Sequence, residues 1–466
     1  MKKILLWLVV LVVIFSMVGL FTLSSCKKEA APEEEVAVEE EEAAPAEEEV
    51  VPEKTKITFW VDSMSGAPFV NMMLAELVPA FNDQSETIEV EGTAITNMMG
   101  AARTALVGGG GPDVLNTGGP SMVIELALAD QLLPLDEFVA EFGWSELFFP
   151  WALDLGKVEG KLYSLPDSCE TLVLYYNKTL FEEKGWTPPT TIDELMILSE
   201  EIAAAGIIPF AQVNAEFPQC NEWFVGEFLN HVAGPEKVYE ALTGQCRWDD
   251  PEFVQAIELL NEVQQNGWFQ GGLDRYWSLT FDESSTSFGN GDAAMHIEGT
   301  WAIAGLSDYF GEKAGNNNDW GWVPMPSTTG EPIFDIGIGS TWSINKNAAN
   351  PSAVAEFMSY YFSPEFQARV VQNGFPSAPV YLKAEALTGI DPRQAEIAVA
   401  LGEASEAGNY GYTLWTFWPA KSDTYMWQEI DKVWSGEITA KQYLEGLQEV
   451  FTEEFEAGEV PPIPAR

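Results

Sequence analysis

Strand-like and helix-like segments alternate through most of the chain after residue 55, and this alternation limits the fold more than any other feature. Residues 56–61 and 87–90 read as strands, and apolar residues at helical spacing lie between them, from Phe69 to Phe81. The pattern recurs, with strands expected at 112–115, 171–176 and 207–210 and helices at 96–106, 191–204, 253–263 and 352–362. Such alternation predicts α/β layers built on a mostly parallel sheet.

Length and charge narrow the class of protein. A chain of 466 residues is long enough for two or more domains. Its 72 Asp+Glu against 23 Lys+Arg give a formal net charge of −49. Nucleic acid is therefore excluded as a partner, because a phosphate polyanion would be repelled, and electrostatic docking on anionic lipid is disfavoured.

The N-terminus carries a targeting signal. Lys2 and Lys3 precede an almost wholly apolar run at 4–23, and the run ends in Leu23-Ser24-Ser25-Cys26. This ending resembles a bacterial lipobox, so residues 1–26 are expected to be a lipoprotein signal peptide with Cys26 as the lipidated residue. An uncleaved membrane anchor is the alternative, because about 20 apolar residues can span a bilayer. Both readings place the body outside the cytoplasm, tethered to a membrane.

Residues 27–53 are expected to be a disordered acidic linker. They contain 12 Glu, two Lys and no aromatic residue, with many Ala, Pro and Val. Self-repulsion and the lack of residues to bury keep such a segment extended. It is interpreted as a solvated spacer between the membrane and the folded body.

Catalytic and metal motifs are largely missing from the sequence. Gly108–Gly111 is not followed by the Gly-Lys-Ser/Thr of a phosphate-binding loop, and no Gly-x-Ser-x-Gly element occurs. With two histidines in the chain, no metal site, cofactor or catalytic residue is predicted. Of the three internal cysteines, Cys220 and Cys246 are the expected disulfide pair and Cys169 the free thiol, although connectivity cannot be read from sequence.

Three blocks in order resemble a known family. The first block is Gly111-Pro112-Asp113-Val114 with Leu132-Leu133-Pro134-Leu135-Asp136. The second runs from Gly160-Lys161-Leu162-Tyr163 to Asn177-Lys178-Thr179-Leu180-Phe181. The third runs from Gly291-Asp292-Ala293-Ala294-Met295 through Gly299-Thr300-Trp301 to Trp322-Val323-Pro324. Together they look like the bacterial extracellular solute-binding proteins that serve carbohydrate ABC importers. The resemblance covers residues 55 to about 455.

The resemblance implies a two-lobed periplasmic-binding-protein fold, with the ligand in a cleft between two α/β lobes and crossover strands as hinges. The first crossover is expected near Leu165–Glu170 and the second near Asp335–Trp342. The N-terminal lobe is expected to contain 54–168 plus about 342–400, and the C-terminal lobe 169–341 plus about 401–466.

The ligand-binding residues follow from the resemblance and from strand ends. Glu170 and Trp301 match a sugar-contacting Glu and a stacking Trp of the family, with a hinge or core role as the alternative. The candidates that follow predicted strands are Glu216, Trp223, Asp62, Ser63, Asn116 and Thr117. The candidates on the expected far wall are Trp342, Trp415, Trp418 and Tyr425, and for each of these core packing is favoured.

The expected function is that of a substrate-binding protein that closes on a sugar or oligosaccharide and delivers it to ABC permease subunits. Carboxylates and amides suit sugar hydroxyls, and Trp and Tyr suit the flat C–H faces of a pyranose. The alternatives are a binder of a cationic or peptide solute, a secreted glycoside hydrolase, or a surface adhesin. The particular sugar, the number of membranes of the host and the state of the cysteines cannot be deduced from sequence.

Overall fold

Two β-sheets organise the chain in the computed structural model, which describes residues 54–63, 67–382 and 388–464. These residues belong to one compact unit, Pro52–Arg466. The expected signal peptide, Cys26 and the whole of the expected linker lie outside the described residues. In the described part of the chain, no helix is long and apolar enough to cross a membrane.

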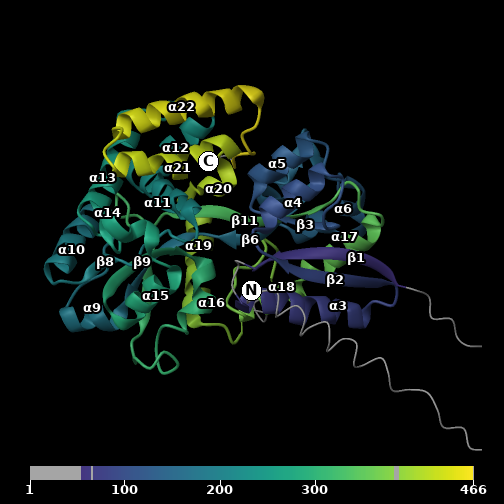
Figure 1. Cartoon of the computed structure of the whole chain (residues 1–466), viewed down its shortest axis with the longest axis horizontal. Helices are drawn as coiled ribbons and strands as arrows, with labels where there is room; N and C mark the ends of the chain where they lie inside the picture. The colour runs from purple at the N-terminus through teal and green to yellow at the C-terminus, as the bar shows by residue number, and fades with distance from the viewer. Residues whose placement is uncertain (1–53, 64–66, 383–387, 465–466) are drawn as a thin grey trace, which may run out of the picture. The chain divides into compact units, whose positions relative to one another are not determined.

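The first sheet has the strand order β12-β11-β3-β1-β2, and β6 also pairs with β11. The second sheet has the order β10-β7-β9-β8. Figure 1 shows β1, β2 and β3 on one side of the molecule, β8 and β9 on the other, and β6 and β11 between them. The strands are β1 Thr55–Asp62, β2 Ile88–Ile95, β3 Val114–Thr117, β4 Lys157–Val158, β5 Lys161–Leu162, β6 Ser164–Glu170, β7 Leu172–Asn177, β8 Ile208–Phe210, β9 Ala293–Gly299, β10 Trp320–Val323, β11 Phe334–Ile344 and β12 Tyr410–Tyr412.

Helices cover both sheets. Those before β7 are α2 Ala67–Asn71, α3 Val78–Gln84, α4 Met98–Val107, α5 Pro120–Leu128, α6 Asp136–Phe142, α7 Trp144–Leu147 and α8 Pro150–Asp154, with a π-helical turn, Met72–Leu77, between α2 and α3. Those from β7 to β11 are α9 Lys178–Lys184, α10 Ile192–Ala204, α11 Asn221–Phe228, α12 Pro235–Leu242, α13 Pro251–Gln265, α14 Gly272–Arg275, α15 Phe281–Asn290 and α16 Ile303–Leu306. The remaining helices are α17 Pro351–Tyr361, α18 Pro364–Gln372, α19 Pro392–Glu406, α20 Leu414–Phe417, α21 Ala420–Trp434 and α22 Ala440–Ala457.

Local sequence signals set several helix ends. Thr191, Thr280 and Thr439 each form a capping box with the Glu or Gln three residues later, so at the starts of α10, α15 and α22 the backbone N–H groups of these two residues are satisfied. Gly185 ends α9 in the left-handed region, with φ of 72°, where a residue without a Cβ is favoured.

Each sheet has its own hydrophobic core. The core of the first sheet combines residues from the early chain, such as Phe59 and Phe81, with residues from the later segment 342–380, such as Phe357. The core of the second sheet draws on residues from Ala152 to Phe451, among them Ile336 and Ile338 of β11. Ile397 of α19 packs in a third cluster with Val173 and Phe334, so this helix lies with the second sheet.

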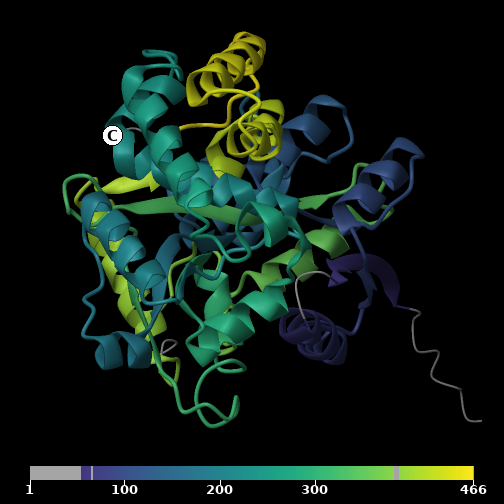
Figure 2. The ribbon, with the colours of Figure 1, turned by 60° about the vertical axis from the view of Figure 1, so that its left-hand side comes forward.

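The two crossover segments are paired strands. β6 runs antiparallel to β11, with Glu170 opposite Gly337 and Asp167 opposite Ser340. The start of β11 pairs with β12 and its end pairs with β3. Figure 2 shows β11 as the long green strand across the middle of the ribbon. Asp335 and Ile344, at its two ends, therefore belong to opposite sides of the molecule.

Two expectations need correction. The sheets are mixed rather than mostly parallel, because β6, β7 and β10 return antiparallel to their neighbours. The expected disulfide is not formed: Cys169, Cys220 and Cys246 are all free thiols. Cys220 Sγ instead donates to Val213 O at 3.5 Å and Cys246 Sγ to Lys237 O at 3.6 Å, so each sulfur has its own local partner.

Candidate ligand-binding cleft

Two adjoining hollows lie where the elements around the first sheet face those around the second. The first has a volume of about 430 Å³ and the second about 360 Å³, and Trp223 and Phe281 line both. Each volume falls in the range of small-molecule sites, about 300–1,000 Å³. We refer to the two hollows together as the cleft.

The wall on the side of the first sheet comes mainly from the ends of parallel strands. Asp62 ends β1, and Asn116, Thr117 and Gly118 end or follow β3. The start of α4 adds Met98 and Met99 to the same wall. Ligands of open α/β sheets generally bind at the carboxyl ends of strands, and this wall has that position.

The facing wall is aromatic. Trp223 of α11 is 9% exposed and lies 5.2 Å, between ring centroids, from Trp301. Phe217 approaches Trp223 at 6.1 Å, and Trp415 approaches Trp301 edge-on at 6.1 Å. Flat rings of this kind offer a large apolar surface with few torsions to immobilise. Trp301 and Phe281 complete the lining on this side.

Two carboxylates of the cleft lining accept hydrogen bonds from backbone N–H groups at the starts of helices. Asp62 Oδ2 accepts from Met98 N at 3.2 Å, at the start of α4. Glu216 Oε2 accepts from Phe281 N at 2.8 Å, at the start of α15. A carboxylate has two oxygens and about four acceptor positions, so each of these side chains retains capacity to accept from a ligand hydroxyl.

Acidic side chains are buried in the crossover strands beneath the cleft. Asp167 accepts from Trp342 Nε1 at 3.0 Å, from Ser340 Oγ at 3.1 Å and from Tyr361 OH. Glu170 accepts from Ser168 Oγ, and a Cβ on Gly339 would overlap its carboxylate. Gly339 and Ser340 themselves line the cleft.

Burial controls the ionisation of Asp167 and Glu170. It raises the pKa of Asp167 to about 6, although the hydrogen bonds that Asp167 accepts lower this pKa. It raises the pKa of Glu170 to about 8, with a smaller contribution from the charges of Asp167 and Glu298. Near neutral pH the Glu170 carboxyl is therefore largely protonated and can donate a hydrogen bond.

A second titratable pair lies in the lining beside Trp301. His296 Nε2 and Glu298 Oε2 are 3.5 Å apart, and both residues line the cleft. Burial lowers the pKa of His296 to about 4 and raises that of Glu298 to about 7. At neutral pH the imidazole is uncharged, so the contact is not an ion pair.

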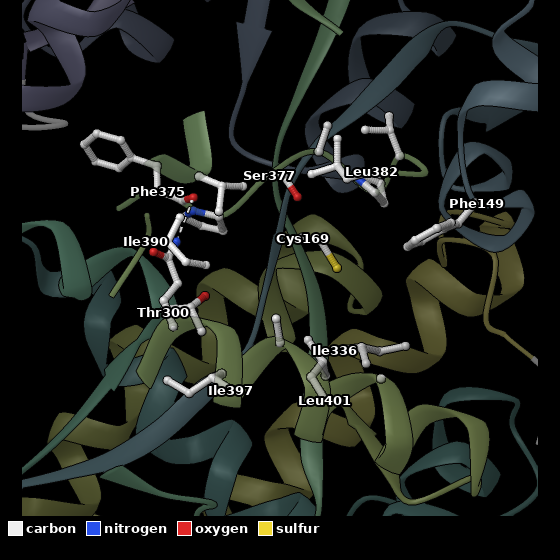
Figure 3. A pocket seen from close by; sticks show the side chains of 18 of the residues that line it. Phe149, Cys169, Thr300, Ile336, Phe375, Ser377, Leu382, Ile390, Ile397 and Leu401 are labelled. Carbon is white, nitrogen blue, oxygen red and sulfur yellow. Dashed lines mark hydrogen bonds between the residues drawn. The ribbon is translucent and has the colours of Figure 1, made fainter. Parts of the chain in front are cut away.

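A separate cavity lies on another side of the crossover strands, with a volume of about 390 Å³. Figure 3 shows its mainly apolar lining, with Cys169 and Ile336 from the crossover strands and Ile397 and Leu401 from α19. Such a surface offers few partners for hydroxyl groups, whereas the cleft presents carboxylates, an amide and hydroxyls beside stacked aromatic rings. A polyhydroxylated ligand therefore fits the cleft better than this cavity.

The structure brings many of the sequence-predicted residues together. The residues that line the cleft are Asp62, Asn116, Thr117, Glu216, Trp223 and Trp301. Ser63 is exposed beside Asp62, where its Oγ lies 3.0 Å from Thr96 Oγ1. Glu170 does not line the cleft itself; its carboxylate lies next to Gly339, which does. Trp415 is half-buried behind Trp301.

Three of the far-wall candidates, Trp342, Trp418 and Tyr425, do not line the cleft and pack in or against the hydrophobic cores, the role favoured for each of them from sequence. Trp342 and Trp418 are 0% exposed. Trp342 stacks on Tyr361 at 4.1 Å in the core of the first sheet, and Trp418 packs 5.2 Å from Trp248 in the core of the second. Tyr425 packs on Tyr443 between α21 and α22, and its OH donates to Tyr443 O at 3.0 Å. Core packing leaves Trp342 and Trp418 unavailable to a ligand, and Tyr425, which is half-buried, lies between α21 and α22 and not in the cleft lining.

Several lining residues were missed from sequence. Met98 and Met99 sit at a helix start without a side-chain cap, Phe281 follows the capping residue Thr280, which marks a helix start and not a cleft, and Ser340 lies within a strand. For His296 and Glu298 there was a signal, because two residues spaced by two on a strand share a face. That signal indicated proximity without indicating that the face lines a cleft.

Comparison with known proteins identifies the family and the fold. Residues 67–368 match the family model described as bacterial extracellular solute-binding protein. An uncharacterised ABC transporter extracellular-binding protein of Pyrococcus horikoshii is 27% identical over 39% of this chain and 40% of its own length. A diacetylchitobiose-binding protein of Streptomyces coelicolor is 29% identical over 26% of this chain and 27% of its own. A maltotriose-binding protein of Pyrococcus abyssi is 25% identical over 58% of this chain and 53% of its own.

The matched stretches thus span between about a quarter and about half of the length of these relatives. Solved structures extend the likeness in fold over most of the chain. A chitin oligosaccharide binding protein superposes with a TM-score of 0.73 at 20% identity, covering 86% of this chain and 98% of its own. A raffinose complex of the binding protein RafE gives 0.67 at 21% identity, covering 86% and 99%.

Proposed function

Because the chain belongs to the family of bacterial extracellular solute-binding proteins, we propose that it binds a sugar or oligosaccharide in the cleft and delivers it to the permease subunits of an ABC importer. The observation that carries the proposal is the composition of the two walls: acceptors at strand ends on one side face Trp223 and Trp301 on the other. Hydroxyl rims and C–H faces of a pyranose require these two kinds of partner.

The size of the cleft favours more than one sugar ring. Its two hollows of about 430 and 360 Å³ adjoin at Trp223 and Phe281, so a chain of rings can occupy both. A disaccharide has about 23 non-hydrogen atoms, and about −0.3 kcal/mol per atom gives about −7 kcal/mol, a dissociation constant in the micromolar range. The names of relatives that bind diacetylchitobiose and maltotriose support the same class of ligand.

Binding is proposed to work by closure around the crossover strands. A ligand that contacts both walls stabilises the closed arrangement over the open one. Moving such an equilibrium from 1:99 to 99:1 takes about 5.5 kcal/mol of differential binding, which is within the free energy available to a disaccharide. No covalent step is needed, and the ligand leaves unchanged.

We further propose that Cys26 carries a lipid and that residues 27–53 are the spacer that keeps the body near the membrane. The lipobox-like Leu23-Ser24-Ser25-Cys26 and the acidic, aromatic-free composition of the spacer support this. Metabolic labelling with a fatty acid should label the full chain and fail with Cys26→Ala. Labelling that survives the substitution would contradict the anchor without affecting the sugar proposal.

Isothermal titration with a panel of xylo-, chito-, malto- and galacto-oligosaccharides tests the function, with a polyamine and a peptide mixture as the other classes. We expect micromolar or tighter binding of one oligosaccharide series and recovery of the sugar intact by chromatography. Binding of the polyamine or peptide alone, or recovery of a hydrolysed sugar, would refute the proposal. Trp301→Ala should weaken the binding at least tenfold, whereas the surface variant Glu258→Gln on α13 should leave it unchanged.

A further inference from the structure

A second constellation of chemical groups lies apart from the cleft, at the start of β11. Glu227 at the end of α11 and His231 one helical turn later face Asp335, the second residue of β11. Their side chains are 0%, 1% and 1% exposed. His231 Nε2 lies 3.2 Å from Glu227 Oε2 and 3.4 Å from Asp335 Oδ1. We call these three residues the buried triad.

The polar atoms of the buried triad have no hydrogen-bond partner of regular geometry. This holds for both carboxylate oxygens of Glu227, both of Asp335 and both ring nitrogens of His231. Among the described residues, no Lys or Arg forms an ion pair with either carboxylate. Buried carboxyl groups are normally paired, hydrogen-bonded or bound to a metal; here two carboxylates share the single imidazole of His231, without the geometry of a hydrogen bond to either.

The spacing of the triad matches a metal coordination shell. Ligands at about 2.0–2.1 Å from Zn²⁺ in a tetrahedral site lie about 3.3 Å from one another. The two distances from His231 Nε2, 3.2 and 3.4 Å, have this value. All three ligand atoms lie within 4.8 Å of one another, so a single ion can contact each of them.

We propose that Glu227, His231 and Asp335 bind one divalent transition-metal ion, with Zn²⁺ the best fit. One imidazole nitrogen and two carboxylate oxygens form a ligand set that Zn²⁺ accepts. Ca²⁺ and Mg²⁺ prefer shells of six or more oxygens, several of them from water, which a site this buried does not supply. The proposal is independent of the sugar ligand and departs from the expectation, based on the two histidines of the chain, that there is no metal site.

The surrounding backbone holds the triad in place. Asp335 pairs with Gly411 of β12, and a Cβ at Gly411 would overlap both Asp335 Oδ1 and Asn230 Oδ1. Asn230, next to His231, accepts from Tyr412 N and donates to Tyr412 O, each at 3.0 Å. Thr328 N donates to His231 O at 3.0 Å. The helix and the two strands are therefore locked together around the three side chains.

A metal at this position joins α11 to the crossover strand β11. α11 carries Trp223 of the cleft wall, and β11 carries Gly339 and Ser340 of the cleft floor. The ion would fix the start of β11 to the helices around the second sheet. When the cleft opens, β11 would then move together with these helices, relative to the part of the molecule built on the first sheet. Its role is structural, and it does not contact the cleft lining.

Metal uptake by the full-length protein tests the proposal. The chain is stripped with dipicolinate, dialysed and loaded separately with Zn²⁺ and Co²⁺, and the bound metal is measured by mass spectrometry. We expect one ion per chain, a rise in melting temperature with Zn²⁺, and a visible absorption of bound Co²⁺ that is distinct from that of the aqueous ion. His231→Gln should lose the stoichiometric ion, and Glu222→Gln, a buried carboxyl in the same helix that is not part of the triad, should retain it.

X-ray absorption of the Zn²⁺-loaded wild type gives a readout that does not depend on a folded variant. A first shell of one imidazole and oxygens supports the triad, whereas sulfur or two imidazoles would assign the ion to other residues and overturn the proposal. Wild-type protein that takes up no Zn²⁺ or Co²⁺, or a Glu222→Gln variant that loses the ion together with His231→Gln, would also overturn it.

Discussion

Glu170→Gln should make the protein more stable at alkaline pH. Burial raises the pKa of Glu170 from 4.5 to about 8, so the folded chain binds this proton more tightly than the unfolded chain. Between these two values the folded state keeps a proton that the unfolded state has released. Its contribution to stability is therefore complete below pH 4.5, falls as the pH rises, and is lost above about pH 8.

The size of the effect follows from the shift. Each pKa unit corresponds to about 1.4 kcal/mol, so the shift of Glu170 amounts to a loss of at most about 5 kcal/mol across this window. Glutamine carries no charge at any pH and retains an oxygen that can accept from Ser168. The variant should match the wild type near pH 4.5 and exceed its free energy of unfolding by several kcal/mol at pH 8.

Urea unfolding of both proteins at a series of pH values from 4.5 to 8.5 measures the difference, provided that the m-values agree. Glu258→Gln, an exposed position on α13, is the control and should show no pH-dependent difference from the wild type. A difference between Glu170→Gln and wild type that stays constant over this pH range would show that Glu170 is not a buried, protonated acid.

Three further changes test other parts of the structure. A Cβ in Gly299→Ala would overlap the ring of Trp301, so sugar affinity should fall about tenfold, equal to about 1.4 kcal/mol, in calorimetric titration. Trp342→Phe removes the hydrogen bond to Asp167 and should lower the free energy of unfolding by about 2 kcal/mol in urea without changing sugar affinity. Thr191→Ala removes the capping box of α10 and should lower the melting temperature in calorimetry, at a cost of about 1 kcal/mol. Unchanged sugar affinity in Gly299→Ala would contradict the first expectation, and weakened sugar binding in Trp342→Phe would contradict the second. An unchanged melting temperature in Thr191→Ala would contradict the third.

The sequence was sufficient for the residues whose position follows from strand ends. Asp62 and Asn116 come directly after runs of β-forming residues, and the ends of parallel neighbours meet at one edge of a sheet. β1 pairs in parallel with both β2 and β3, so the two side chains reach the same wall. The family blocks added Trp301, which lies in the lining beside Trp223.

Residues in the middle of crossover strands were harder to place. β11 lies between β6, β3 and β12 and is covered on both faces for most of its length, so alternation of polar and apolar residues does not show which side meets the ligand. Ser340 reaches the cleft, whereas Trp342, two residues later, is buried against Tyr361. The packing of α17 on Trp342 through Phe357 and Tyr361 decides this, and the residues next to Trp342 in the sequence do not encode it.

The acidic groups show a different limit of sequence reasoning. With 72 Asp and Glu in the chain, their abundance cannot identify the few that are buried together. His231 and Glu227 are one helical turn apart and could be paired from spacing alone, but Asp335 reaches them only because β11 pairs with β12 and Asn230 fastens β12 to the same helix. Buried carboxyl groups thus lie at two places along the paired crossover strands: Asp335 at the start of β11, and Asp167 and Glu170 on β6 under the cleft. Burial opposes the charge of each of these groups, so a change in the ionisation of Asp167 or Glu170, or in metal occupancy at Asp335, is expected to alter the packing around β11.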